Sequence, residues 1–147
     1  MGAPITPAAV MTREQLEATL RREFPEMWDG TNSRRIEDVG YLTATVRSIY
    51  DPSQLRPGGT ISGPTMMGLA DLALYAAIMG SVGPVTLAVT TNLSFNFLRK
   101  PAQKDLIAEC RLLKLGKRLA VGDVFIRSDG EDDVVCHATG TYSIPPR

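Results

Sequence analysis

The chain has 147 residues with 16 basic and 16 acidic side chains and one histidine, so its formal net charge is zero. This length suits one domain with a sizeable core, and the balanced charge argues against a surface that binds nucleic acid through clustered positive charge. Two cysteines are too few for a disulfide scaffold, and with one histidine they match no metal-site spacing. The first residues lack the basic start and apolar run of a signal peptide, so we expect a cytoplasmic protein with neither metal nor cofactor.

A helix is predicted near the start of the chain. Thr12 and Gln15 have the spacing of a capping box, and apolar residues then recur at helical intervals up to a natural stop at Pro25. The preceding residues, 1–11, are rich in proline and alanine and suggest a loose arm. The polar stretch 28–35 indicates a loop.

The next helix is unusually apolar. Between residues 60 and 98 the only formally charged side chain is Asp71, and residues 65–80 have almost no polar face. A helix that is apolar nearly all round is buried in a protein core or in a membrane. We expect the core, because the run is shorter than the ~20 residues of a membrane span and has an acid near its middle.

Glycine and proline mark both ends of this helix. Gly63 fits the N-cap and Pro64 the first helical position, where the missing N–H costs nothing. Gly80 and Gly83 indicate the end of the helix. Before the helix, residues 41–50 are rich in β-branched and aromatic side chains and predict a strand.

Strands fill the rest of the chain. In residues 85–97 apolar side chains alternate with small polar ones, which predicts a long strand with Thr90 and Asn92 together on its polar face. Three more strands are predicted, at 105–115, 118–128 and 133–144. An antiparallel sheet curled around the apolar helix buries both elements, so the predicted fold class is α+β. The open edge of such a sheet favours a dimer.

The order of these elements resembles the hotdog fold, and the residues around the apolar helix resemble the PaaI-like (phenylacetate-type) acyl-CoA thioesterases. In that family a His-Gly-Gly segment opens the central helix and Leu-x-Asp follows. Here Ser62-Gly63-Pro64 and Leu69-Ala70-Asp71 stand at those places, after the matching loop residues Gly59-Thr60. Three positions depart from the pattern: Ser62 replaces the histidine, Pro64 the second glycine, and Arg56 an asparagine before the loop.

This resemblance covers roughly residues 39–144 and implies a long central helix wrapped by a curved antiparallel sheet. We expect a single domain, in which residues 1–35 form an N-terminal arm and helix and residues 36–147 form the hotdog part. The resemblance also implies a homodimer or a dimer of dimers, with sites at the subunit interface to which opposing chains can contribute Gly63 and Asp71. Neither nucleic acid nor a membrane is an expected partner.

The activity implied by the resemblance is hydrolysis of acyl-CoA thioesters with a small, medium-chain or aromatic acyl group, giving free acid and CoA. Asp71 would act as general base or nucleophile, the Gly63 amide would polarise the thioester carbonyl, and the Thr90 hydroxyl would hold the water. The alternative is a non-catalytic acyl-CoA-binding or regulatory hotdog protein: the three departures support it, whereas the retained Asp71 favours the enzyme. A hydratase ranks last, because His137 lies in the wrong strand for the required acid–histidine pair.

Asp71 and Gly63 are candidates on physical grounds as well. An ionised carboxylate inside an apolar helix costs several kcal/mol unless it is paired or hydrogen-bonded, so its presence calls for a reason. The amides at a helix start can stabilise a developing oxyanion, and a glycine lets substrate approach closely. The structural alternatives are that Asp71 accepts bonds from hydroxyls of the following strand, and that Gly63 only starts the helix.

Further residues are candidates for substrate binding: Ser62, Thr65, Asn92, Arg56, Lys117 and Arg118. Ser62 suits a helix cap or a substrate contact, and Thr65 can supply a second amide because Pro64 has none. Arg56, and Lys117 with Arg118 on a predicted turn, could meet CoA phosphates, although solvated charges are the commoner explanation.

Overall fold

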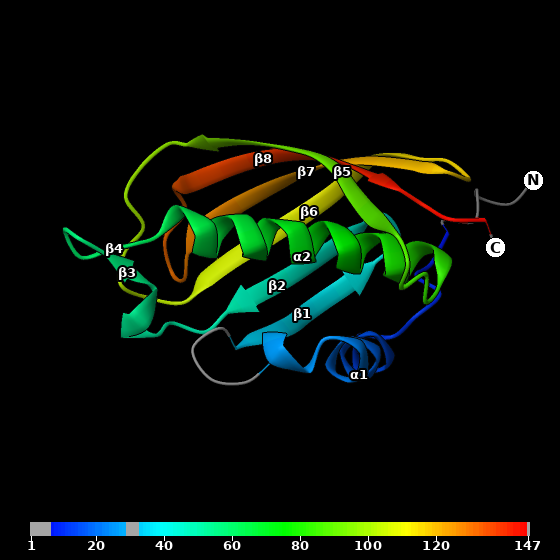
Figure 1. Ribbon diagram of the computed structural model, residues 1–147, viewed down its shortest axis with the longest axis horizontal. Helices are drawn as coiled ribbons and strands as arrows, with labels where there is room; N and C mark the ends of the chain where they lie inside the picture. Colours follow the sequence, from blue (N-terminus) through cyan, green and yellow to red (C-terminus); the bar gives the residue numbers. More distant parts are fainter. Residues whose placement is uncertain (1–6, 29–32, 147) are drawn as a thin grey trace, which may run out of the picture.

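The computed structural model describes residues 7–28 and 33–146. A long helix, α2 (Gly63–Val82), lies in the hollow of a curved antiparallel sheet that has six strands in the described part of the chain (Figure 1). The strand order is β1-β2-β6-β7-β8-β5. The strands are β1 (Arg34–Gly40), β2 (Thr43–Ser48), β5 (Val89–Phe97), β6 (Leu106–Leu115), β7 (Leu119–Ser128) and β8 (Val134–Ser143). The predicted α+β class and helix-on-sheet arrangement are confirmed.

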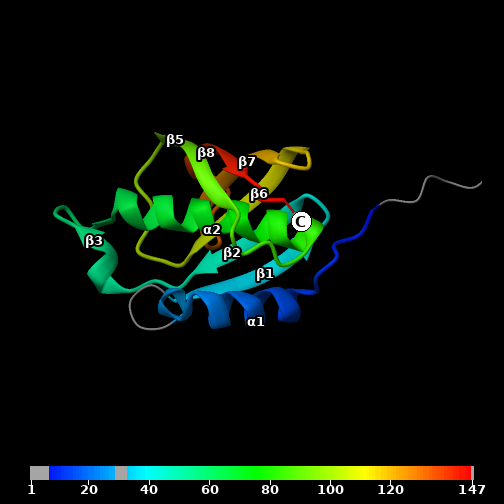
Figure 2. The ribbon, with the colours of Figure 1, turned by 45° about the vertical axis from the view of Figure 1, so that its right-hand side comes forward.

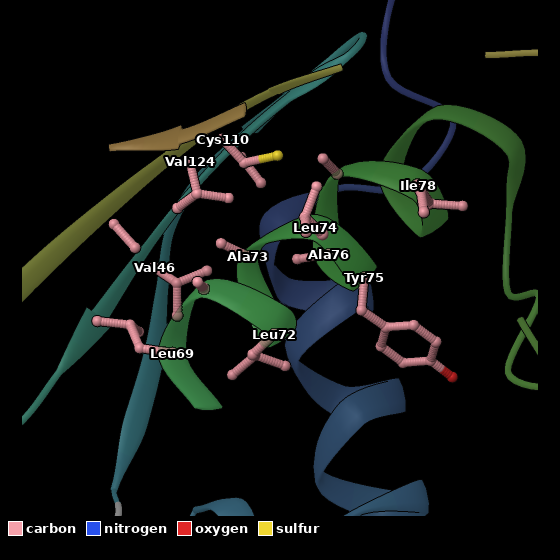
Figure 3. Packing of buried hydrophobic residues seen from close by; sticks show 14 of the residues in the cluster. Val46, Leu69, Leu72, Ala73, Leu74, Tyr75, Ala76, Ile78, Cys110 and Val124 are labelled. Carbon is pink, nitrogen blue, oxygen red and sulfur yellow. The ribbon is translucent and has the colours of Figure 1, made fainter. Parts of the chain in front are cut away.

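Helix α2 can be apolar all round because the fold covers most of it. It packs on β2, β6 and β7, and Figure 3 shows Val46, Cys110 and Val124 pointing from these strands towards it. The side chain of Leu74 packs on Gly122 of β7 and Gly140 of β8, which pair with each other in register. A Cβ on Gly122 would lie only 2.9 Å from a methyl carbon of Leu74, and one on Gly140 would lie closer still. The bare glycine backbone therefore lets the helix approach the sheet closely.

The ends of α2 differ from the prediction by a few residues. Ser62 is the N-cap, its hydroxyl accepting a hydrogen bond from the Thr65 amide at 3.4 Å, so Gly63 is the first helical residue and not the cap. The helix continues through Gly80 and ends at Gly83, whose φ of 105° is in the left-handed region. With 20 residues it is long and apolar enough to cross a membrane, yet 78% of its most apolar window is buried within the fold.

The N-terminal helix α1 (Arg13–Glu23) begins at the predicted capping box of Thr12 and Gln15 and lies along β1 (Figure 2). A short 3-10 turn, η1 (Pro25–Met27), follows it. The predicted arm is not loose throughout: the amide of Val10 donates to the carbonyl of Gly80 at 2.7 Å, while residues 1–6 lie outside the described part.

The structure corrects the predicted strands in three places. Strand β1 was not predicted, and its first two residues belong to the stretch expected to be a loop. Strand β2 is shorter than residues 41–50, because Leu42, with a φ of 67°, turns the chain between β1 and β2. Strand β5 begins at Val89 and not at residue 85. The three C-terminal strands lie where they were predicted.

Between β2 and α2 the chain forms a small excursion from the main sheet. It contains a 3-10 turn, η3 (Pro52–Gln54), and a short hairpin of β3 (Leu55–Arg56) and β4 (Thr60–Ile61). This hairpin brings the chain to the N-terminus of α2, beside the end of β5.

Candidate active site

Asp71 lies near the middle of α2 and is held by two hydroxyl groups. The Thr90 hydroxyl donates a hydrogen bond of 2.6 Å to Oδ1 of Asp71, and the Tyr142 phenol donates one of 2.5 Å to the same oxygen. The phenol also lies 3.1 Å from the main-chain carbonyl oxygen of Asp71. The carboxylate is half-buried, and these hydrogen bonds compensate for the hydration that it loses in an apolar helix.

A β-bulge brings Thr90 to Asp71. Thr90 pairs with Tyr142 and Leu93 with Gly140, so Thr91 is an extra residue in β5. The extra residue places Thr90 on the helix side of the sheet with Leu93, while Asn92 pairs with Thr141 and faces outwards, where it is exposed. The prediction that Thr90 and Asn92 share one face is therefore wrong, and Asn92 is not near Asp71.

Tyr142 is the residue of this cluster that the sequence analysis missed. Its side chain is buried in β8, and burial together with the nearby Asp71 carboxylate raises the pKa of the phenol above its usual range. The phenol therefore stays protonated and can donate to Asp71 at neutral pH. Alternation along residues 133–144 places Tyr142 on an inner face, but no sequence signal states which helix residue it meets.

Asp71 opens onto a pocket of about 440 Å³ between α2, β5 and the end of α1. Its walls are largely aromatic and aliphatic: Phe24, Leu72, Tyr75, Thr86, Leu87, Ala88, Val89, Thr90 and Tyr142. The ring of Tyr75 meets Phe24 edge to face at 5.7 Å, and its hydroxyl donates to the carbonyl of Thr86 at 2.6 Å. The pocket thus contains one carboxylate, that of Asp71, among mostly apolar side chains.

Gly63 lies at the N-terminus of α2, about two helical turns before Asp71. Among the first helical amides, that of Thr65 bonds to Ser62, that of Met66 bonds to the Ser62 carbonyl, and Pro64 has none. The Gly63 amide has no bond to any other group in the described residues, so it is available to a ligand. Ser62 serves as the cap, and Thr65, whose hydroxyl lies 2.9 Å from that of Ser62, is buried.

A second pocket, of about 460 Å³, contains Gly63 and carries positive charge at its rim. Three cationic side chains line it: Arg56, Arg99 and Lys100. All three are exposed, as solvated charges would be, and Arg99 lies 3.8 Å from the exposed carboxylate of Asp133. Phe97, Leu98 and Met66 provide apolar walls.

Lys117 and Arg118 do not join this second pocket within one subunit. They lie in the turn between β6 and β7, and the next residue, Leu119, pairs with Ser143, which in turn pairs with Val89. This turn is therefore at the Thr90 end of β5, whereas Gly63 is at the Phe97 end, where a Cβ on Gly63 would lie 3.6 Å from the Phe97 ring.

Gly63 and Asp71 of one chain do not form a single site. They are eight positions apart on the helix, which is about 12 Å along its axis. The two residues also line different pockets. A thioester carbonyl at the Gly63 amide is thus out of reach of the carboxylate in the same subunit.

The described residues include no group of three metal-binding side chains of the His, Cys, Asp and Glu types. His137, which the sequence analysis treated as structural, lies 3.0 Å from Asp123 and lines neither pocket. Both cysteines are buried, and burial raises the pKa of Cys110 to about 12 and that of Cys136 to about 11. Asp71 is therefore the side chain to which we assign the candidate catalytic role.

Comparison with known proteins agrees with this geometry. A family model described as the thioesterase superfamily matches residues 58–135, just over half of the chain. A candidate thioesterase from Silicibacter sp. TM1040 is 42% identical, with a TM-score of 0.84 and 94% of each chain covered. No curated protein matches the chain.

More distant structures show the fold. Zebra fish thioesterase superfamily member 2 is 16% identical with a TM-score of 0.78, covering 92% of this chain and 99% of that chain. The E. coli PaaI protein from the phenylacetic acid degradation operon is 18% identical with a TM-score of 0.76, covering 92% and 96%. The chain therefore belongs to the thioesterase superfamily, whose reaction is thioester hydrolysis, and it has the hotdog fold that PaaI shares.

Proposed function

We propose that the protein hydrolyses acyl-CoA thioesters in sites that form between two subunits. One observation carries this proposal: the acid in its apolar pocket and the free amide in its cation-rimmed pocket lie at opposite ends of the same strand, β5. That strand is an edge of the sheet in the described part of the chain, and apolar residues on and around it are exposed, including Val89, Phe97 and Leu98. An unpaired edge with exposed apolar side chains favours association with a second copy.

A two-fold axis beside the middle of β5, relating two subunits, would bring the two halves of the proposed site together. Antiparallel pairing of two β5 edges places the Phe97 end of one strand beside the Thr90 end of the other. Gly63 lies beside Phe97, and Asp71 is bonded to Thr90. The Gly63 amide of one subunit then approaches the partner subunit's Asp71, which supports a homodimer with two equivalent sites.

The chemistry follows from these two groups. The Gly63 amide, at the positive end of α2, would donate to the carbonyl oxygen of the thioester as negative charge develops there. Asp71 would either take a proton from the attacking water or attack the carbonyl carbon itself, giving an anhydride that water then opens. In both routes the bond between carbon and sulfur breaks, CoA leaves as a thiolate and the acid is released.

The two pockets suit the two parts of an acyl-CoA. The cations at the rim of the Gly63 pocket, Arg56, Arg99 and Lys100, would attract the phosphates of CoA. The same two-fold axis would bring the β6–β7 turn of the partner subunit, with Lys117 and Arg118, to this end of the site. The aromatic and aliphatic walls around Asp71 suit an apolar acyl group of medium length or with a ring.

Substitution of Asp71 by asparagine tests the proposal. Asp71→Asn keeps both hydrogen-bond acceptance from Thr90 and side-chain size, but it can neither take a proton nor attack, so turnover should fall to the spontaneous rate. Thiol release would be measured on a panel of short, medium, long and aromatic acyl-CoAs, with Asp38→Asn, a substitution of an exposed acid on β1, as control. Unchanged turnover in Asp71→Asn would remove this residue from the mechanism. A folded wild type that binds acyl-CoA and hydrolyses no member of the panel would favour the binding-protein alternative.

A further inference from the structure

We infer that Tyr142 is a positioning residue for Asp71: together with Thr90 it fixes the carboxylate so that Oδ2 is the oxygen that acts on the substrate. This inference rests on the proposed role of Asp71 in thioester hydrolysis. Tyr142 lies on the last strand, and its phenol would join Asp71, the Gly63 amide and Thr90 in the proposed site.

The contacts distinguish the two carboxylate oxygens. Oδ1 of Asp71 accepts the hydroxyls of both Thr90 and Tyr142, at 2.6 Å and 2.5 Å. Within the described residues Oδ2 receives no hydrogen bond, and Asp71 lines the apolar pocket. With Oδ1 occupied, Oδ2 is the oxygen left to meet a water molecule or the acyl carbon.

Tyr142 is itself held firmly enough to position another group. It lies on β8, between β7 and β5, in register with Ala120 on one side and Thr90 on the other. Its side chain is only 3% exposed, and its ring lies 6.1 Å from that of Tyr75. The second contact of the phenol, 3.1 Å to the main-chain oxygen of Asp71, ties it to the helix as well as to the carboxylate.

The phenol keeps the proton that it donates. Burial raises the pKa of Tyr142 well above its usual range, so the phenol remains a donor to the Asp71 carboxylate at neutral pH. A hydrogen bond to a charged acceptor is stronger than one between neutral groups. Loss of this hydroxyl should therefore leave the carboxylate less firmly fixed.

Tyr142→Phe tests this inference because it removes one oxygen and keeps the buried ring. We expect kcat/KM at neutral pH to fall by about 10- to 100-fold, the range for a lost hydrogen bond to a charged group. We also expect the loss to lie in kcat with KM little changed, because the substrate contacts remain while the reacting oxygen is no longer fixed, and a packing role would not give this split. Thr90→Val should lower kcat in the same way, and Thr90→Ser, which keeps the hydroxyl, should restore it. Tyr41→Phe, in the exposed turn after β1, is the matched control.

A second readout does not need turnover. In protein labelled with ¹³C at the aspartate carboxyl carbon, the Asp71 signal at pH 7, assigned by its absence in Asp71→Asn, should have a different chemical shift in Tyr142→Phe than in the wild type. An unchanged signal in both Tyr142→Phe and Thr90→Val would overturn the inference even if the wild type is an active thioesterase. Lower activity that lies in KM, with kcat unchanged, would also overturn it. A changed signal in a protein that hydrolyses no thioester would instead support the positioning role and contradict the proposed function.

Discussion

Arg34 is a buried basic residue with an unpaired Nη1 in the described part of the chain. Only 6% of the residue is exposed, and its Nη2 is near α2, 3.9 Å from where a Cβ on Gly68 would lie. In the described part of the chain neither its Nη1 nor the hydroxyl of Ser48, its neighbour in register on β2, has a hydrogen-bond partner. Burial lowers the pKa of Arg34 to about 10, which means that the folded state disfavours the charged guanidinium.

Arg34→Met should therefore stabilise the protein, by about 1–3 kcal/mol in the free energy of unfolding at pH 7. Because the folded pKa lies below the unfolded value of 12.5, the cost is fully present at neutral pH and shrinks as the pH rises above about 10. The gain should accordingly be smaller at pH 10.5 than at pH 7, which urea titrations at both values would measure. Arg35→Met, at the exposed next position, should change little. A loss of stability in Arg34→Met would contradict this account.

The sequence identifies the residues of the proposed site that belong to α2 more readily than those that reach it from the sheet. Asp71 is conspicuous because it is the one charge in a long apolar stretch, and Gly63 because it opens the helix. Thr90 was proposed as a neighbour of the acid, but on the wrong face, because simple alternation cannot reveal the extra residue at Thr91. Tyr142 could not be assigned at all, since its contact depends on the register of β5 against β8.

At the scale of elements, α1 closes the pocket that contains Asp71. Phe24, at the C-cap of α1, lines that pocket and packs edge to face on Tyr75. Part of the pocket wall is thus supplied by an element outside the sheet and α2. In the proposed reaction, α1 can therefore limit the length of the acyl chain.

Phe24→Ala should shift acyl preference towards longer chains. Removing the ring enlarges the pocket by roughly the volume of several methylene groups, and each methylene in an apolar pocket is worth about 1 kcal/mol or more. We expect the ratio of kcat/KM for a long-chain to a short-chain acyl-CoA to rise by about tenfold. Phe125→Ala, which truncates an exposed ring away from either pocket, should leave the ratio unchanged. An unaltered ratio in Phe24→Ala would show that the acyl group does not reach α1.

The helices and strands differ in how clearly their sequences predict them. Helix α2 was predicted because its composition is extreme, and β6, β7 and β8 because their patterns are regular and their turns well marked. Strand β1 was missed because four of its seven residues are charged and its burial pattern is not a clean alternation. It is a strand because a tight turn returns the chain into β2 and because α1 covers it, and both are tertiary effects.

At the scale of the whole molecule, a single subunit holds the two halves of the proposed site in different pockets. No spacing in the sequence reveals this separation of Gly63 from Asp71, eight residues apart on one helix. The expectation that the two groups come from opposing chains rested on the family resemblance alone. A protein that is strictly monomeric in solution would contradict the proposed site. Sedimentation or light scattering should therefore detect at least a dimer.

Subunit mixing tests the shared site directly. Gly63→Pro removes the amide hydrogen at a helical position that tolerates proline, and Gly63→Ala keeps it at a place where a Cβ makes ordinary contacts. The proline variant and Asp71→Asn should each be inactive alone, while the alanine variant should retain most activity. After the two inactive proteins are unfolded together and refolded, half of the dimers are mixed, and each mixed dimer has one site with both groups intact, so about a quarter of wild-type activity should return. If each subunit used its own Gly63 and Asp71, every site in the mixture would lack one group and no activity would return.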